Sequence, residues 1–190
     1  MANKLPLEEQ TGADLIYYNE TFSSFVMVQY KAMNPGTEGQ EFRWQSDDQL
    51  AREIARMTAL LVELRKQPSD LRPISFRLNN NPFFLKMCSR VIFNPDDKGL
   101  FKGMYLPVDF WMRLSRDDAT KGPKGGRVLT YQNTQRWLTN SEFASLVANA
   151  WVGTPISQSE LLKRIIERII ESGKTVTIAI KGTLDEAEAT

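Results

Sequence analysis

Two short apolar runs most constrain the fold of this 190-residue chain. Leu15–Tyr18 and Phe25–Lys31 are rich in β-branched and aromatic residues, which is typical of strands. The polar segment Asn19–Ser24 is short enough to join them as an antiparallel pair. The segment that follows, Met33–Gln40, contains proline and glycine and is predicted to be a loop. The sequence therefore predicts a strand pair as part of a sheet.

Three later segments carry the one-sided apolar pattern of amphipathic helices. Each begins with a capping-box motif, in which a Ser or Thr precedes a Glu or Gln by three residues: Ser46–Gln49, Thr139–Glu142 and Ser157–Glu160. The apolar positions recur at helical spacing at Leu50, Ile54, Met57, Leu61 and Leu64, at Phe143, Leu146, Val147, Ala150 and Trp151, and at Leu161, Leu162, Ile165, Ile166, Ile169 and Ile170. We therefore expect three helices, each with one buried face.

The remaining signals complete a mixed pattern. Val108–Leu114 predicts a short helix, whereas Pro73–Leu78 and Thr175–Lys181 predict strands. Strands and helices without an internal repeat indicate an α/β or α+β fold, with a small mixed sheet flanked by helices. The length predicts a single domain over residues 1–190.

Composition excludes several kinds of catalytic and metal site. The chain has no histidine and a single cysteine, Cys88, which excludes Ser-His-Asp and Cys-His catalysis and zinc sites of the Cys/His type. A metal would have to bind oxygen ligands, as Mg²⁺, Mn²⁺ and Ca²⁺ do. The net charge of +1 leaves nucleic-acid binding to a local patch. Without a membrane span or an apolar N-terminal signal region, we expect a cytoplasmic protein.

Polar side chains at the ends of the two predicted strands form the candidate site. Gln29 and Lys31 share a strand face because they are two residues apart. A six-residue loop would place Asp14 opposite Gln29, and a four-residue loop would place it opposite Met27 on the same face. An odd-length loop would turn Asp14 to the other face. Opposed residues bring their Cβ atoms roughly 4.5 to 5.5 Å apart, close enough for two oxygen ligands to share one small cation.

Such a cluster suits phosphodiester hydrolysis. A carboxylate and an amide oxygen can hold a divalent cation, which activates water and offsets charge on the phosphorane. A lysine ammonium nearby can orient that water or stabilise the developing oxyanion. The alternative is a surface hairpin that ends in solvated polar residues.

The order of these motifs resembles the core of the PD-(D/E)XK nuclease superfamily, in the Mrr-like variant with Gln in place of the second acidic residue. "GADL", "VQYK" and the helix after Ser46 follow one another as that family's second strand, third strand and helix do. The resemblance covers residues 10–66 and implies that 67–190 is a family-specific extension with two C-terminal helices and a final strand. It implies that Asp14 and Gln29 bind Mg²⁺ or Mn²⁺, that Lys31 is the catalytic lysine, and that the substrate is DNA, in a restriction or anti-phage system.

One departure from the family leaves alternatives open. The family places a Glu-bearing helix and a first strand before the Asp, whereas only thirteen residues precede Asp14. Glu8 or Glu9 could supply the additional acid, or Asp47 or Asp48 could reach in from the following helix. Otherwise the chain would be partial, split, or an inactive nuclease-fold subunit that serves DNA binding or assembly. An unrelated α/β interaction domain is the third hypothesis.

A second candidate site is the glycine-rich segment Thr120–Arg127. Its cations, Lys121, Lys124 and Arg127, could contact DNA phosphates, since glycine backbone lets a phosphate approach closely. The alternative is a solvated loop. The expected partners are DNA, a partner subunit or upstream domain, and a second copy of the chain.

Overall fold

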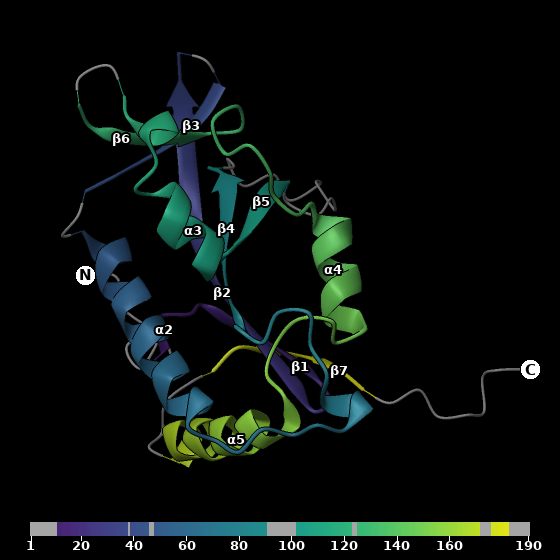
Figure 1. The fold of residues 1–190 in the computed structure, drawn as a ribbon. Coiled ribbons are helices and arrows are strands. Elements are labelled where there is room, and N and C mark those ends of the chain that lie inside the picture. Colours follow the sequence, from purple (N-terminus) through teal and green to yellow (C-terminus); the bar gives the residue numbers. More distant parts are fainter. Residues whose placement is uncertain are drawn as a thin grey trace, which may run out of the picture.

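The computed structural model describes residues 11–37, 39–45, 48–90, 102–122, 125–171 and 176–182. In these ranges the chain forms a seven-stranded mixed sheet and four α-helices, so the predicted α/β class is confirmed (Figure 1). The strands are β1 (Leu15–Asn19), β2 (Ser24–Gly36), β3 (Gly39–Trp44), β4 (Phe83–Ser89), β5 (Gly103–Pro107), β6 (Arg127–Thr130) and β7 (Ile178–Lys181). The helices are α2 (Gln49–Arg65), α3 (Val108–Leu114), α4 (Asn140–Ala148) and α5 (Ile156–Glu171), with 3₁₀ turns η1 (Pro73–Ser75) and η2 (Asp118–Thr120).

The long strand β2 organises the sheet. The strand order is β5-β4-β2-β1-β7, in which β1 runs antiparallel to β2 while β4 runs parallel to it. At the far end of β2, Asn34–Gly36 pairs with β3, which in turn pairs with β6. Tyr18 pairs with Phe25, as the six-residue loop predicts. The predicted antiparallel pair is therefore confirmed, with its register.

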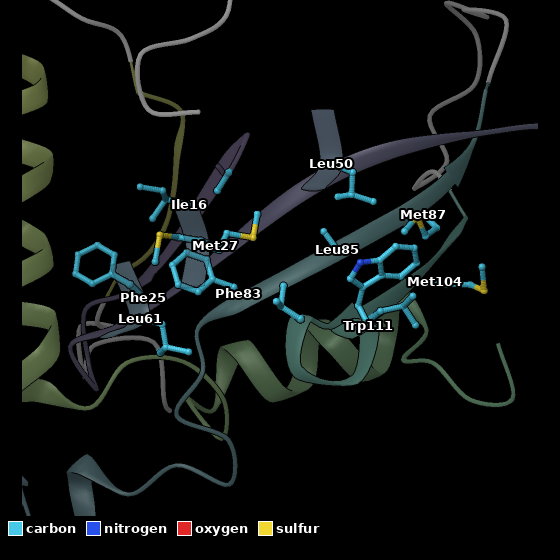
Figure 2. Close-up of a cluster of buried hydrophobic side chains, with 14 of the residues drawn as sticks. Ile16, Phe25, Met27, Leu50, Leu61, Phe83, Leu85, Met87, Met104 and Trp111 are labelled. Carbon is cyan, nitrogen blue, oxygen red and sulfur yellow. The ribbon is translucent and has the colours of Figure 1, made fainter. Parts of the chain in front are cut away.

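Apolar side chains bury both faces of the sheet. On one face Met27, Leu85 and Ile16 pack with residues of α2, α3 and α5 (Figure 2). On the other face Val28 and Phe84 pack with Phe143 of α4. Figure 1 shows the same division, with α4 on the opposite side of the sheet from α2 and α3. Burying a side chain of this size contributes about 1.5–3 kcal/mol, so both layers stabilise the sheet.

The predicted capping signals have different outcomes. The capping box of Thr139 and Glu142 at the start of α4 is confirmed. Helix α2 begins later than predicted, at Gln49, because Asp48 is the residue whose side chain accepts the Ala51 backbone N–H. Helix α5 also differs: it begins at Ile156, and the hydroxyl of Ser157 donates to the Pro68 carbonyl instead of capping the helix.

The predicted secondary structure is wrong for two segments. Met33–Gln40 is not a loop, because β2 continues to Gly36 and pairs with β3 from Gly39 as a hairpin. Proline has no backbone N–H to donate to a neighbouring strand. Pro35 is tolerated because β2 pairs with β4 only as far as Met33, so β4 requires no hydrogen bond from this position.

Pro73–Leu78 contains the turn η1 instead of a strand. The buried guanidinium of Arg77 donates to the carbonyls of Ile74, Phe76 and Phe22, which replaces the hydrogen bonds of a strand ladder.

In the part of the chain that the structure describes, no helix combines the length and apolar character needed to cross a membrane.

Candidate functional site

A glycine positions Asp14 where the chain enters β1. Gly12 has a backbone φ of +74°, and a Cβ atom at this position would lie 2.6 Å from the carbonyl oxygen of Glu53 in α2. Only glycine therefore lets the chain pass this close to the helix. The backbone N–H of Asp14 then donates to the Val28 carbonyl at 2.9 Å. The entry to β1 is thus held between β2 and α2.

Asp14 and Gln29 are in direct contact. Gln29 Nε2 donates to Asp14 Oδ2 at 2.8 Å, and the backbone N–H of Tyr30 donates to the same oxygen at 2.8 Å. An ionised Asp14 carboxylate can only accept, which agrees with the NH₂ group of Gln29 facing it. Its carbonyl oxygen, Oε1, is buried and has no hydrogen-bond partner among the described residues. A buried amide oxygen without a partner costs about 1–3 kcal/mol, so this atom is available to a ligand.

The surroundings of Asp14 oppose its ionisation. Burial is the largest cause and raises the pKa of its carboxyl above the ordinary value. The Tyr30 N–H, the Lys31 ammonium and the Gln29 amide lower that pKa, while the negative charge of Glu53 raises it. A divalent cation would stabilise the ionised form in this site.

Lys31 and Glu53 form a buried ion pair across the sheet–helix interface. Lys31 Nζ lies 2.5 Å from Glu53 Oε2, and the Glu53 side chain is fully buried while that of Lys31 is 14% exposed. Gln49 Nε2 donates to the other carboxylate oxygen, Oε1, at 2.7 Å. Residues of β2 and α2 therefore hold this carboxylate in place.

Glu53 was missed by the sequence reasoning, although the sequence contains a signal for it. It lies three residues after Leu50 and four before Met57, on the buried face of α2. A charged residue at an apolar position of the helical pattern requires a buried partner. That pattern could have identified Glu53 as a site residue.

The structure brings the three predicted residues Asp14, Gln29 and Lys31 together on one face of the sheet, beside Glu53. Asp48 does not join them, because its side chain accepts from Ala51 and Gln45 at the start of α2. The predicted acids Glu8, Glu9 and Asp47 lie outside the described residues.

The oxygen atoms of this cluster fit a hard divalent cation better than a softer metal. Asp14 and the free Oε1 of Gln29 are the candidate ligands, with Glu53 nearby. Among the described residues no group of three His, Cys, Asp or Glu side chains could hold a metal. Mg²⁺ needs only one or two carboxylates because it keeps several of its waters, so the set suits Mg²⁺ or Mn²⁺.

The predicted basic segment lies at the far end of β2 from Asp14, since β6 pairs with β3 there. Lys121 Nζ pairs with Asp118 at 2.6 Å. The Arg127 guanidinium donates to the Asp117 carbonyl at 2.6 Å and to the Thr120 hydroxyl at 3.0 Å. Lys124 lies outside the described residues. These hydrogen bonds of Arg127 stabilise the turn η2. Lys121 is the more exposed of the two cations.

Comparisons of this chain with protein-family models, with curated proteins and with solved structures found no match.

Proposed function

We propose that the chain is a Mg²⁺- or Mn²⁺-dependent DNA endonuclease domain with Asp14, Gln29, Lys31 and Glu53 as its catalytic centre. The observation that carries the proposal is the buried, unpartnered Oε1 of Gln29 beside a carboxyl group with a raised pKa. One bound cation would relieve both costs, since it accepts the amide oxygen as a ligand and neutralises the carboxylate.

The residues of the chain take separate roles in this proposal. The bonds from Gln29 and Tyr30 converge on Asp14 Oδ2 and fix the orientation of the carboxylate. Lys31 has three N–H donors, of which one is directed to Glu53, so the others are available to a phosphate oxygen or the attacking water. Bound Mg²⁺ would lower the pKa of a coordinated water and offset charge on the phosphorane.

The order of elements supports the resemblance to the PD-(D/E)XK superfamily. Asp14 precedes β1, Gln29 and Lys31 lie on β2, and α2 comes after the intervening strand β3, with Glu53 reaching the cluster from that helix. The sequence named Asp47 and Asp48 as the acids that this helix could supply; in this proposal Glu53 takes that role instead. The resemblance further implies a cytoplasmic restriction or anti-phage role, with DNA as the substrate.

The second candidate function is an inactive nuclease-fold subunit that binds DNA or assembles with a partner. The ion pair of Lys31 and Glu53 favours it, because each of these buried charges already has its partner within the fold and needs no role in catalysis. The two candidates differ in one respect: only the first requires cleavage that depends on a divalent cation.

Cleavage of supercoiled plasmid and of linear DNA, with Mg²⁺, Mn²⁺ or a chelator, tests the proposal. Gln29→Glu should retain cleavage because it keeps an oxygen ligand, whereas Gln29→Met should lose it. Gln158→Met is the matched control, since Gln158 is also buried with an unpartnered Oε1 among the described residues but lies in α5. Its cleavage should equal that of the wild type.

The outcomes separate the candidates. DNA binding without cleavage under any of these conditions would favour the inactive subunit. Equal loss in Gln29→Met and Gln158→Met would show that both substitutions act through the fold, and would contradict a ligand role for Gln29.

A further inference from the structure

The other face of the sheet holds a cavity of about 570 Å³ between strands β1, β2, β4, β5 and β7 and helix α4. Its lining includes aromatic side chains, Tyr17, Tyr30, Tyr105 and Phe143, and one buried cation, Lys86. Lys86 follows Leu85 on β4, so it points to the face opposite the Asp14 cluster. The cavity is therefore separate from the proposed catalytic centre, and a ligand could bind there whether or not the chain is a nuclease.

Lys86 is a buried lysine without a carboxylate partner. The residue is 6% exposed, makes no ion pair with the described residues, and none of the described lining residues is acidic. The Lys86 ammonium lies over two aromatic rings: Nζ is 4.9 Å from the ring centroid of Tyr105 and 5.5 Å from that of Tyr30. Contacts of this kind offset only part of the cost of burying an ammonium group.

Two states could relieve that cost: a neutral amine, or an ammonium paired with an anion from outside the chain. Burial lowers the pKa of Lys86, and the neighbouring Cys88 opposes that change only by its charge. The other titratable groups around it are the phenols of Tyr17, Tyr30 and Tyr105 and, at the rim, Lys181, whose Nζ donates to the Ala148 carbonyl at 2.6 Å. Burial raises the pKa of Tyr30 and of Tyr105, so neither of these phenols supplies an anion at neutral pH.

The shape and lining of the cavity indicate what kind of anion could bind beside Lys86. A volume of this order is typical of sites for small organic ligands. Tyr105 and Phe143 already stack with their ring centroids 3.8 Å apart, and Tyr17 meets Phe143 edge-on at 5.7 Å. Aromatic walls of this kind favour a flat apolar body, and the single cation favours one acidic group.

We propose that this cavity binds a small planar aromatic carboxylate, whose acid group pairs with Lys86 and whose ring lies against the tyrosines and Phe143. The site is assembled from five strands and α4, so its floor is fixed by the sheet instead of by a loop (Figure 1). An aromatic ligand of the same shape without the acid would leave the ammonium unpaired and should bind more weakly.

Titration calorimetry of the full chain with benzoate and 2-naphthoate, each beside its neutral primary amide, tests this site. We expect saturable binding of at least one carboxylate, and affinity that falls by about 10- to 150-fold in Lys86→Met, the range for a hydrogen bond to a charged group. Binding of the amides should change little in that variant. Lys66→Met is the control, since Lys66 is an exposed lysine paired with Glu63 at the end of α2.

Two further readouts distinguish the site from nonspecific binding. Pairing with the carboxylate requires the charged form of Lys86, so the affinity for the carboxylate should fall as the pH rises through the pKa of this ammonium. Lys86→Met should unfold at a temperature no lower than the wild type, because Met keeps the volume and removes a buried charge. Absence of saturable binding for both carboxylates, or equal carboxylate affinity in Lys86→Met and wild type, would overturn the proposal.

Discussion

Replacement of Lys31 by methionine should destabilise the fold far more than replacement of an exposed lysine. Lys31→Met keeps most of the side-chain volume but leaves the Glu53 carboxylate fully buried without its cation. Removing one partner of a buried pair costs roughly 3–5 kcal/mol. Since the Lys31 side chain is 14% exposed and water can reach it, we expect the lower end, about 3 kcal/mol.

Equilibrium unfolding in urea, followed by tryptophan fluorescence, measures this cost. The midpoint should fall without a change in m, because the surface exposed on unfolding is nearly the same. For a chain of this size the loss corresponds to a decrease in Tm of about 6–12 °C. The double variant Lys31→Met/Glu53→Met should recover most of the loss, since apolar replacement of a buried pair is often neutral.

Lys66→Met is the matched control. Lys66 pairs with Glu63 at 2.6 Å, nearly the same separation, but both side chains are more than half exposed. Its loss should stay below about 1 kcal/mol, as for other surface pairs. A loss in Lys31→Met no larger than in Lys66→Met would refute the reasoning, because burial would then add nothing to the pair.

Three further predictions follow from the same contacts. Because burial raises the pKa of Asp14 above 3.8, its contribution to stability is full below that pH and is lost as the pH rises through the folded pKa. Mg²⁺ competes with that proton, so the increase in Tm caused by Mg²⁺ should grow over the same pH range; an increase independent of pH would contradict a role for Asp14. Gly12→Ala should lower the free energy of unfolding by more than about 1 kcal/mol, since it combines a positive φ with a close approach to α2; an unchanged urea midpoint would contradict it. If Lys121 contacts a DNA phosphate, Lys121→Ala should flatten the slope of log affinity against log salt by about 0.9, and an unchanged slope would make the segment a solvated connection.

Local patterns in the sequence predict much of this fold. Strands β1 and β2 and the buried face of α2 were found because their apolar spacing is regular, and α3 because it is bounded clearly. The apolar face predicted for α4 is correct at Phe143 but wrong at its end, because the helix stops at Ala148 and Trp151 beyond it is 45% exposed. Strand β3 was not predicted because the proline and glycine of Met33–Gln40 indicated a loop where the structure forms a hairpin. Strands β5 and β6 were not predicted because they are only five and four residues long, and β6 pairs with β3, which is distant in the sequence. The prediction of a strand at Pro73–Leu78 was wrong because the hydrogen bonds of this segment depend on Arg77. The partners of Arg77 are set by tertiary packing.

The candidate site divides in the same way. The parity of two neighbouring strands was enough to place Asp14 beside Gln29. The partner of Lys31 required knowledge of how α2 packs on the sheet, and the cavity around Lys86 required knowledge of which strands flank β4. Neither follows from residue spacing, because each contact joins elements whose relative position is fixed only by the complete core.

The most direct test of whether Asp14 belongs to a Mg²⁺-dependent catalytic centre is cleavage of supercoiled plasmid. Wild-type protein and Asp14→Asn are purified identically and assayed with Mg²⁺. The variant keeps an oxygen that can accept from Gln29 and Tyr30, and it removes a buried carboxylate, so its Tm should not fall. We expect Mg²⁺-dependent cleavage by the wild type and no cleavage by the variant. Equal cleavage by both proteins, or cleavage by the wild type that persists in a chelator, would contradict this expectation.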